Sequence, residues 1–427
     1  MLMIDPKQLD RAIWGKQENK LPTMQSIKFP VKVHSALGWL AAQSDMYKGY
    51  WQDREGEKVC YLGALIKITS LSDISSYLAQ YPEQRFYGGV TFDQTQPQWP
   101  GFPACQFILP QIELRLNDDE QWLYIHNWQS MSAEQRIATL KSLRSETKLR
   151  WQSPQFKLVA QHPSQPMWHS LVNSVTQADA LKACPKVVLA RQSIYQANEH
   201  INALALLEQW QQLQPDNYAF YLSNQPDQSF FGVPPERLYQ RLGQSLATEA
   251  LAGTGQSSEQ QHTRAKLGQK LLHDTKNNHE NQFVADAIYQ ALTSMSQNIQ
   301  IAPMQLVEQR HLQHLCQKIT AQLHPHTTDT DLLTALHPTP AVAGLPRVKA
   351  QHYLAEHEPF DRGWYAGAVG FISQKKSDFT VAIRCAHQNQ QQLSVYAGAG
   401  IVKGSEAQSE WQELQRKSAT IQGLLNV

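Results

Sequence analysis

The sequence lacks the features of a membrane-spanning, secreted or nucleic-acid-binding protein. It has no run of about 18 apolar residues that could cross a bilayer. Its first residues turn acidic at once and lack the sustained apolar segment of a secretory signal. Basic and acidic residues nearly balance, 38 against 37, so bulk charge attracts no polyanion. We therefore expect no membrane span and no nucleic-acid partner.

Cysteine is scarce and irregularly placed. The five cysteines are odd in number and never spaced C-x-x-C. Such a pattern is typical of reduced thiols rather than of a disulfide framework or a zinc site. We therefore expect a cytoplasmic protein.

The common catalytic and nucleotide-binding motifs are also missing. No H-E-x-x-H, G-x-S-x-G or Walker A pattern occurs. The segment Gly398-Ala-Gly400-Ile-Val-Lys-Gly404 resembles a dinucleotide loop, but its third glycine comes one residue late and only 23 residues follow, too few for a βαβ unit. We expect this segment to precede the C-terminal helix, where its backbone N–H groups could hold a small carboxylate.

The chain is long enough for one large globular domain or for two to three ordinary ones, with 427 residues of which 41% are apolar. Several strand-like runs follow one another without a helix between them. This order predicts an α+β fold rather than a doubly wound parallel sheet. Residues 1–120 carry none of the motifs discussed below, so they are expected to form a supporting part. The strand-like runs are 186–190, 218–222, 379–383 and 393–397; the helix-like runs are 201–213 and 278–292; the connections are 93–106, 161–167 and 323–331.

The C-terminal segment has charges on a face that should be apolar. At about 100° per residue, an apolar stripe from Trp411 to Leu425 also contains Glu410, Glu413 and Lys417. Carboxylates on the inward side of a helix are costly unless they are neutralised, paired or bound to a cation. Taken alone, this helix favours an ordinary Glu413–Lys417 ion pair at i,i+4 spacing.

A second helix changes this balance. Glu280 shares a face with Val284 and Ile288, so it also points inward. Three inward carboxylates on two elements suit a hard cation with oxygen ligands, such as Mg²⁺. The alternative is that Glu280 only complements the dipole of its helix from the first turn.

Two further residues are candidates for a catalytic role. Lys186 begins a strand directly after a proline, and a buried lysine can lose its proton and act as a base, although most lysines at strand starts are solvated. Glu236 follows two prolines that stiffen the backbone and can fix a carboxyl group, although Pro-Pro-Glu is also ordinary turn chemistry. Neither signal is specific alone.

Taken together, these segments resemble the chorismate-utilising enzymes, which include anthranilate, aminodeoxychorismate, salicylate and isochorismate synthases. The matches occur in order from about residue 180 to the C-terminus, and the region 170–427 is expected to be the chorismate-binding catalytic part. Tyr50-Trp-Gln-Asp-Arg and Tyr61-Leu-Gly-Ala resemble menaquinone-pathway isochorismate synthases more weakly. The matching segments are Lys186-Val-Val-Leu-Ala-Arg, Pro235-Glu-Arg-Leu, Thr248-Glu-Ala-Leu-Ala-Gly-Thr254, Glu280-Asn, His337-Pro-Thr-Pro-Ala-Val-Ala-Gly-Leu-Pro346, Trp364-Tyr-Ala-Gly, Ala382-Ile-Arg384, Gly398-Ala-Gly-Ile-Val and Glu410-Trp-Gln-Glu413.

The resemblance implies one large α+β unit over residues 1–427, with two stacked antiparallel sheets surrounded by helices, as in anthranilate synthase component I. It implies Lys186 as the base that activates water and Glu236 as the acid that protonates the departing hydroxyl. The implied Mg²⁺ ligands are Glu280, Glu413 and, directly or through water, Glu410. The implied substrate-binding residues are Thr254, Ala341, Tyr365, Arg384, Gly398, Gly400 and Lys417.

A few positions select the branch of the family. Ala252 stands where aminodeoxychorismate synthases have a nucleophilic lysine, and Ala341 stands where salicylate and anthranilate synthases tend to have threonine. The resemblance thus implies a magnesium-dependent isochorismate synthase for menaquinone synthesis, without a glutaminase subunit. Salicylate synthase, siderophore-pathway isochorismate synthase and a chorismate-sensing pseudoenzyme are the alternatives. Asn277 departs from the family, since many relatives have an acidic residue there, and its effect on the metal's outer shell stays open.

Overall fold

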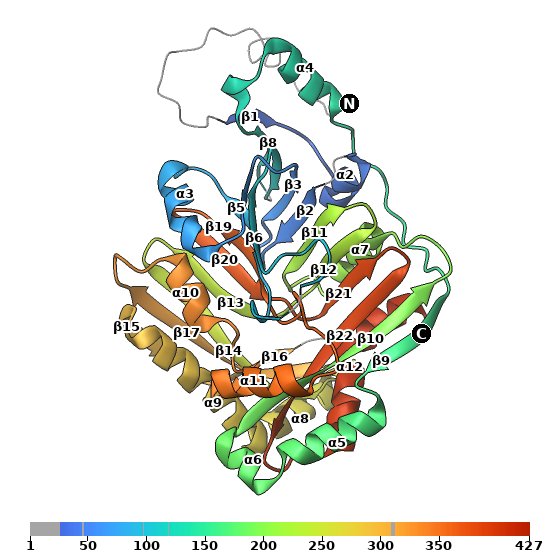
Figure 1. Ribbon diagram of the computed structural model, residues 1–427, viewed down its shortest axis with the longest axis vertical. Coiled ribbons are helices and arrows are strands. Elements are labelled where there is room, and N and C mark those ends of the chain that lie inside the picture. The colour runs from blue at the N-terminus through green and yellow to red at the C-terminus, as the bar shows by residue number, and fades with distance from the viewer. Residues whose placement is uncertain (1–25, 45–46, 97, 118, 309–311) are drawn as a thin grey trace.

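The computed structural model describes residues 26–44, 47–96, 98–117, 119–308 and 312–427. Within these ranges the chain folds into two large antiparallel sheets surrounded by helices (Figure 1), so the predicted α+β class is confirmed. The first sheet has the strand order β1-β8-β7-β3-β2-β11-β12-β21-β22-β10-β18, with β9 paired to β10. Its strands are β1 (Ile27–Pro30), β2 (Lys48–Gln52), β3 (Lys58–Leu62), β7 (Ile112–Leu116), β8 (Gln121–Ile125), β9 (Phe156–His162), β10 (Lys186–Ala197), β11 (Ala219–Gln225), β12 (Gln228–Gly232), β18 (Gly344–Leu345), β21 (Cys385–Asn389) and β22 (Gln392–Val402).

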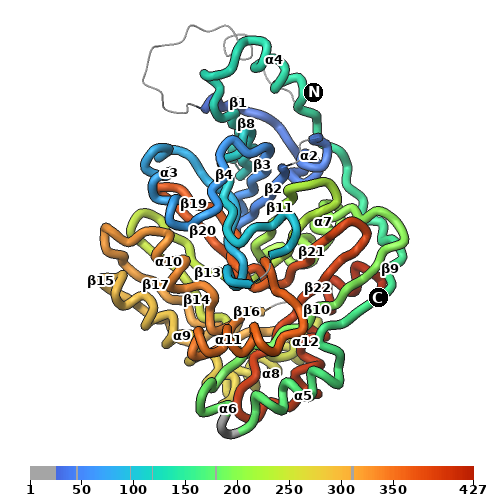
Figure 2. The backbone as a smooth tube through the Cα atoms, viewed as in Figure 1, coloured from blue at the N-terminus to red at the C-terminus, as the bar shows by residue number. Residues whose placement is uncertain are grey.

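The second sheet has the order β15-β17-β14-β13-β20-β19-β5-β6-β4, with β16 paired to β17. Its strands are β4 (Ile66–Ile68), β5 (Phe86–Val90), β6 (Cys105–Leu109), β13 (Arg237–Leu242), β14 (Ser245–Gln256), β15 (Ser296–Ile301), β16 (Gln305–Glu308), β17 (Leu312–Leu323), β19 (Ala368–Ile372) and β20 (Lys376–Val381). Strands from the first 125 residues therefore enter both sheets. Figure 2 shows the N-terminal strands in blue beside green β11, which pairs with β2.

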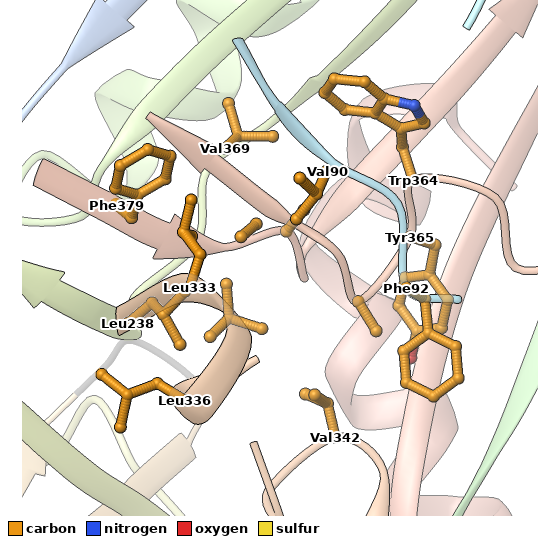
Figure 3. Close-up of a cluster of buried hydrophobic side chains, with 14 of the residues drawn as sticks. Val90, Phe92, Leu238, Leu333, Leu336, Val342, Trp364, Tyr365, Val369 and Phe379 are labelled. Atoms are coloured by element: carbon orange, nitrogen blue, oxygen red, sulfur yellow. The ribbon is translucent and has the colours of Figure 1, made fainter. Parts of the chain in front are cut away.

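The main core lies where the two sheets face each other. Figure 3 shows part of it, with Leu238 of β13 and Phe379 of β20 close to Leu333 and Leu336 of a neighbouring helix. At about 25 cal/mol per Å² of buried apolar area, such side chains supply most of the stabilisation of the fold. Val342 and Tyr365 extend this core up to the wall of the site described below.

Helices cover the outer faces of the sheets. α9 packs on β14 and β17, and α12 packs on β22, α5 and α7. These two helices carry the carboxylates that the sequence places on inward faces. The helices are α2 (Ala36–Ala42), α3 (Ile74–Gln80), α4 (Ala133–Ser142), α5 (Gln165–Val175), α6 (Ala178–Ala183), α7 (Ala203–Leu213), α8 (Gln261–Leu272), α9 (Thr275–Thr293), α10 (Asp329–Leu336), α11 (Arg347–His357) and α12 (Ala407–Leu425), with short 3₁₀ turns at Leu71–Asp73 and Trp128–Ser130. In the described part of the chain, none of them is long and apolar enough to cross a membrane.

The structure corrects several predicted boundaries. α9 begins at Thr275, three residues early, because the side chain of Asp274 caps it by accepting from the Asn277 N–H. The predicted strand 379–383 ends at Val381. The predicted connection 161–167 is short, because β9 extends to His162 and α5 starts at Gln165.

Candidate active site

One pocket of about 720 Å³, measured with its opening to solvent, brings the predicted site residues together. It lies between β10 and β22 of the first sheet and β14 and β17 of the second, and α9 and α12 add further side chains. Every predicted site residue lines it except Lys186, which contacts the lining residue Glu280, and Glu410, which pairs with Lys276. The lining predicted residues are Glu236, Thr254, Glu280, Ala341, Tyr365, Arg384, Gly398, Gly400, Glu413 and Lys417.

Three carboxylates each face an ammonium group. Lys186 is fully buried, and its Nζ lies 3.0 Å from Glu280 Oε1. The side chains of Glu413 and Lys417 form the expected i,i+4 pair at 2.6 Å, and Lys417 Nζ also donates to the Gly398 carbonyl at 2.9 Å. In the third pair the lysine is 42% exposed and the carboxylate is buried.

The third pair joins Lys276 of α9 to Glu410 of α12, with 3.0 Å between Nζ and Oε1. Sequence reasoning missed Lys276, although its position four residues before Glu280 offered a signal. Burial and the neighbouring Glu413 carboxylate raise the pKa of Glu410, although the ammonium group of Lys276 partly offsets this rise. Burial would also raise the pKa of Glu280, but the ammonium of Lys186 outweighs it and holds that pKa below its ordinary value.

The donor chemistry of this group fits a hard divalent cation. Glu280, Glu410 and Glu413 offer only oxygen ligands, which Mg²⁺ prefers. Their oxygens do not converge: in the described ranges, the one acidic trio with oxygens within 4.8 Å of one another is Asp53, Glu55 and Asp378, outside the pocket. Burial lowers the pKa of Lys276, but Glu410, Glu280 and Glu413 together hold it above its ordinary value, so all three carboxylates act on one ammonium group.

The two pocket glycines correct an expectation. Gly398 and Gly400 lie inside strand β22, opposite Ala190 and Val188, and not at the N-terminus of α12, which begins at Ala407. The sequence placed them in a loop because glycines are rare inside strands. Here they leave room for neighbouring groups. A Cβ atom on Gly400 would lie 2.6 Å from Glu280 Oε1, and one on Gly398 would lie 2.8 Å from the Tyr365 hydroxyl oxygen.

Glu236 is a buried carboxyl group at the start of the second sheet. Burial, followed by the nearby Glu249 carboxylate, raises the pKa of Glu236 to about 8, against the opposing charge of Lys186. The hydroxyl of Thr339 donates to Glu236 Oε1 at 3.4 Å. Glu236 therefore carries a proton at neutral pH and can donate it into the pocket.

Arg384 forms the cationic end of the pocket. It has a φ of 48°, in the left-handed region that non-glycine residues rarely adopt, and such strain is often found at functional sites. Its Nη1 donates to the carbonyl of Lys417, which ties it to α12. Burial lowers the pKa of Arg384 to about 10, so the guanidinium is still charged at neutral pH beside Tyr365.

The second sheet contributes to the pocket a histidine that sequence reasoning missed. His314 of β17 is buried, and its Nδ1 lies 3.1 Å from the Thr254 hydroxyl. Burial and the positive charges of Arg384 and Lys417 hold the pKa of His314 well below its ordinary value, so the imidazole is neutral. No motif in the sequence singles out this residue.

Asn277 has a structural role that the sequence did not reveal. Its Oδ1 accepts from the Thr254 N–H at 3.1 Å, and its Nδ2 donates to Asp274 at 2.8 Å. It therefore fixes the end of β14 against the start of α9. Ala252, which stands where aminodeoxychorismate synthases have a nucleophilic lysine, lines the pocket with a small inert side chain.

Comparison with known proteins identifies the family of the chain. A model of the family described as chorismate binding enzyme matches residues 7–426. The chain is 36% identical over 414 residues to the isochorismate synthase MenF of Escherichia coli (strain K12), covering 94% of this chain and 93% of that protein. It is 32% identical over 365 residues to the salicylate biosynthesis isochorismate synthase of Pseudomonas aeruginosa, covering 80% and 74%.

Solved structures give the same result. The structure of MenF, the menaquinone-specific isochorismate synthase from Escherichia coli, matches with a TM-score of 0.88 at 33% identity over 98% of both chains. Anthranilate synthase component I from Streptococcus pneumoniae shares the fold, with a TM-score of 0.70 at 21% identity, over 96% of this chain and 94% of that one. The chain therefore belongs to the chorismate-binding enzyme family. Within that family it groups with the isochorismate synthases, which are isomerases, as the resemblance implied.

Proposed function

We propose that this enzyme is a magnesium-dependent isochorismate synthase. It converts chorismate to isochorismate by adding water at C2 and releasing the C4 hydroxyl. The observation that carries the proposal is the pairing, at one pocket, of a buried carboxyl group that keeps its proton at neutral pH with a buried lysine. Glu236 is the carboxyl group and Lys186 is the lysine. Hydroxyl transfer needs such an acid and such a base on different sides of one ring.

The charges of the pocket support a dicarboxylate substrate bound with a divalent cation. Glu280, Glu410 and Glu413 would hold the ion, Glu410 directly or through water. Bound Mg²⁺ would neutralise these carboxylates and hold the ring carboxylate of chorismate. Chorismate carries two negative charges and Mg²⁺ carries two positive charges, so binding both leaves the net charge of the site unchanged. Neither charge is therefore buried without a partner of opposite sign.

The cationic wall binds the other end of the substrate. Arg384 and Tyr365 donate hydrogen bonds to the pyruvyl carboxylate, since a guanidinium suits a carboxylate in two-pronged geometry. The backbone amides of Gly398 and Gly400 add donors, and Lys417 contacts a carboxylate or the surroundings of the metal. Thr254 and Ala341 shape the wall around the ring.

The acid and the base act at two different carbon atoms of the ring, C4 and C2. Lys186 must first release to solvent the proton that it holds in its ion pair with Glu280. Its neutral amine then accepts a proton from the water that attacks C2, and Glu236 gives its proton to the hydroxyl that leaves C4 as water. Each such step contributes about 10²–10⁴-fold to the rate. Burial keeps competing water from both groups.

The menaquinone pathway is the assignment we favour, because a solved structure that matches over 98% of both chains is described as the menaquinone-specific isochorismate synthase. Ala341 and Ala252 favour an enzyme that stops at isochorismate, without pyruvate loss or amination. We further propose that residues 1–427 work as one unit in the cytoplasm, with no glutaminase subunit. The five cysteines are all free thiols, as that compartment requires.

Product analysis tests the proposal. The enzyme is incubated with chorismate and Mg²⁺ and the products are separated by chromatography, with ammonium present in a parallel reaction. We expect isochorismate alone. Stoichiometric pyruvate in a lactate-dehydrogenase-coupled assay would instead indicate the salicylate branch, and anthranilate would indicate an aminating enzyme.

A further inference from the structure

A residue of the N-terminal part reaches the segment that carries Glu236. Arg54 lies in the turn between β2 and β3, where no site residue was predicted. Its Nη1 donates to the Pro235 carbonyl at 3.1 Å, although Pro235 is 181 positions away in the chain. This hydrogen bond holds the backbone directly before Glu236.

The same guanidinium binds a buried carboxylate with two hydrogen bonds. Its Nη1 lies 3.1 Å from Glu249 Oε1, and its Nη2 lies 2.8 Å from Oε2. Glu249 is on β14 and is 5% exposed. Two parallel N–H···O bonds fix the relative orientation of the two planar groups as well as their distance.

Glu249 in turn holds the backbone directly after Glu236. Its Oε1 accepts from the Arg237 N–H at 2.9 Å. On the other side, β20 holds the Glu236 carbonyl, which accepts from the Thr380 hydroxyl at 2.6 Å and from the Val381 N–H at 3.1 Å. The backbone around Glu236 is thus held from the N-terminal turn, from β14 and from β20.

We propose that Arg54 and Glu249 are positioning residues that fix Glu236 for proton donation, which rests on the proposed function of Glu236 as the acid. The N-terminal part of the chain therefore completes the active site, because the β2–β3 turn supplies one half of this clamp. The charged and polar groups that face Glu236 are Glu249 from β14, Lys186 from β10, Lys417 from α12 and the Thr339 hydroxyl.

The test compares Arg54→Met, Arg54→Lys and Glu249→Gln with a matched control. The control is Glu55→Gln in the same turn, because Glu55 forms an ion pair with the Arg237 side chain at 2.5 Å but does not touch the backbone beside Glu236. Thermal melting checks folding, and kcat, KM and the pH dependence of kcat/KM are measured for each variant with chorismate and Mg²⁺.

We expect Arg54→Met to lower kcat about 10–100-fold, the cost of a small misplacement of a reacting group, and to change KM for chorismate less than about threefold. Arg54→Lys should recover part of this loss, since its ammonium can reach one Glu249 oxygen. Glu249→Gln keeps an acceptor for the Arg237 N–H but removes a negative charge near Glu236. The alkaline limb of its pH profile should therefore move to lower pH, and Glu55→Gln should match the wild type.

Two outcomes would overturn the clamp. One is an Arg54→Met enzyme with wild-type kcat, and the other is a Glu249→Gln profile with an unmoved alkaline limb. If Arg54→Met does not fold, Arg54→Lys and Glu249→Gln still decide the question. If Glu236→Gln itself remains active, the proposed acid is wrong, and this result is distinct from a failure of the clamp alone.

Discussion

Replacing Glu236 with glutamine should stabilise the protein at alkaline pH while it removes activity. In the folded enzyme, burial and Glu249 raise the pKa of Glu236 from 4.5 to about 8. Between these two values the native state keeps the proton and the unfolded chain releases it. The free energy of unfolding of the wild type therefore falls as pH rises through this window.

The size of the effect follows from the two pKa values. Integrating proton binding between pH 5 and pH 9 gives a loss of about 4 kcal/mol for the wild type from this one group. Glutamine has nearly the same shape and does not titrate, so Glu236→Gln escapes the loss. The same variant cannot donate a proton, and its kcat should fall at least about 100-fold.

Urea denaturation at pH 5, 7 and 9 measures the stability of both proteins, and a chorismate turnover assay measures activity. The stability advantage of Glu236→Gln should grow steadily with pH. Exposed Glu356 on α11 supplies a control, and Glu356→Gln should show no growing advantage. An advantage of Glu236→Gln that is equal at pH 5 and pH 9 would refute the reasoning, because the carboxyl group would then titrate alike in both states.

Three further predictions concern the ion, the base and the substrate. Exhaustive chelation should abolish turnover, and Glu413→Gln should weaken the activation of turnover by added Mg²⁺. Full activity in protein shown to be metal-free by elemental analysis would contradict the metal site. Lys186→Ala should lose at least about 100-fold in kcat yet still bind chorismate in a fluorescence titration, and retention of more than about a tenth of the activity would place the base elsewhere. Arg384→Met should raise KM for chorismate about 10–100-fold, the worth of a hydrogen bond to a charged group, and an unchanged KM in steady-state assays would remove Arg384 from the substrate contacts.

Periodicity made the carboxylates on the two helices predictable. Glu280 and Glu410 stand on faces that must turn inward, whatever the rest of the chain does, and the structure buries both faces. Their grouping at one pocket could not be derived in this way. It depends on how β10 and β22 pair across about 200 residues, and no local pattern specifies that register.

Other features depend on long-range contacts even more strongly. Closely spaced glycines predict a loop, yet Gly398 and Gly400 are strand residues, and their missing side chains leave room for Tyr365 and Glu280. The sequence leaves the effect of Asn277 on the metal's outer shell open, and the hydrogen bond that its side chain accepts from the Thr254 N–H is visible only in the folded chain. Arg54 likewise becomes significant only once β2 is seen beside β11.

In the proposed mechanism, water deprotonated at Lys186 supplies the hydroxyl at C2. A reaction in H₂¹⁸O, followed by mass spectrometry of isochorismate and of its fragments, tests this most directly. We expect one ¹⁸O atom per product molecule, located at C2. Isochorismate without ¹⁸O would show that the hydroxyl shifts within the substrate, and it would contradict both the attacking water and the base assigned to activate it.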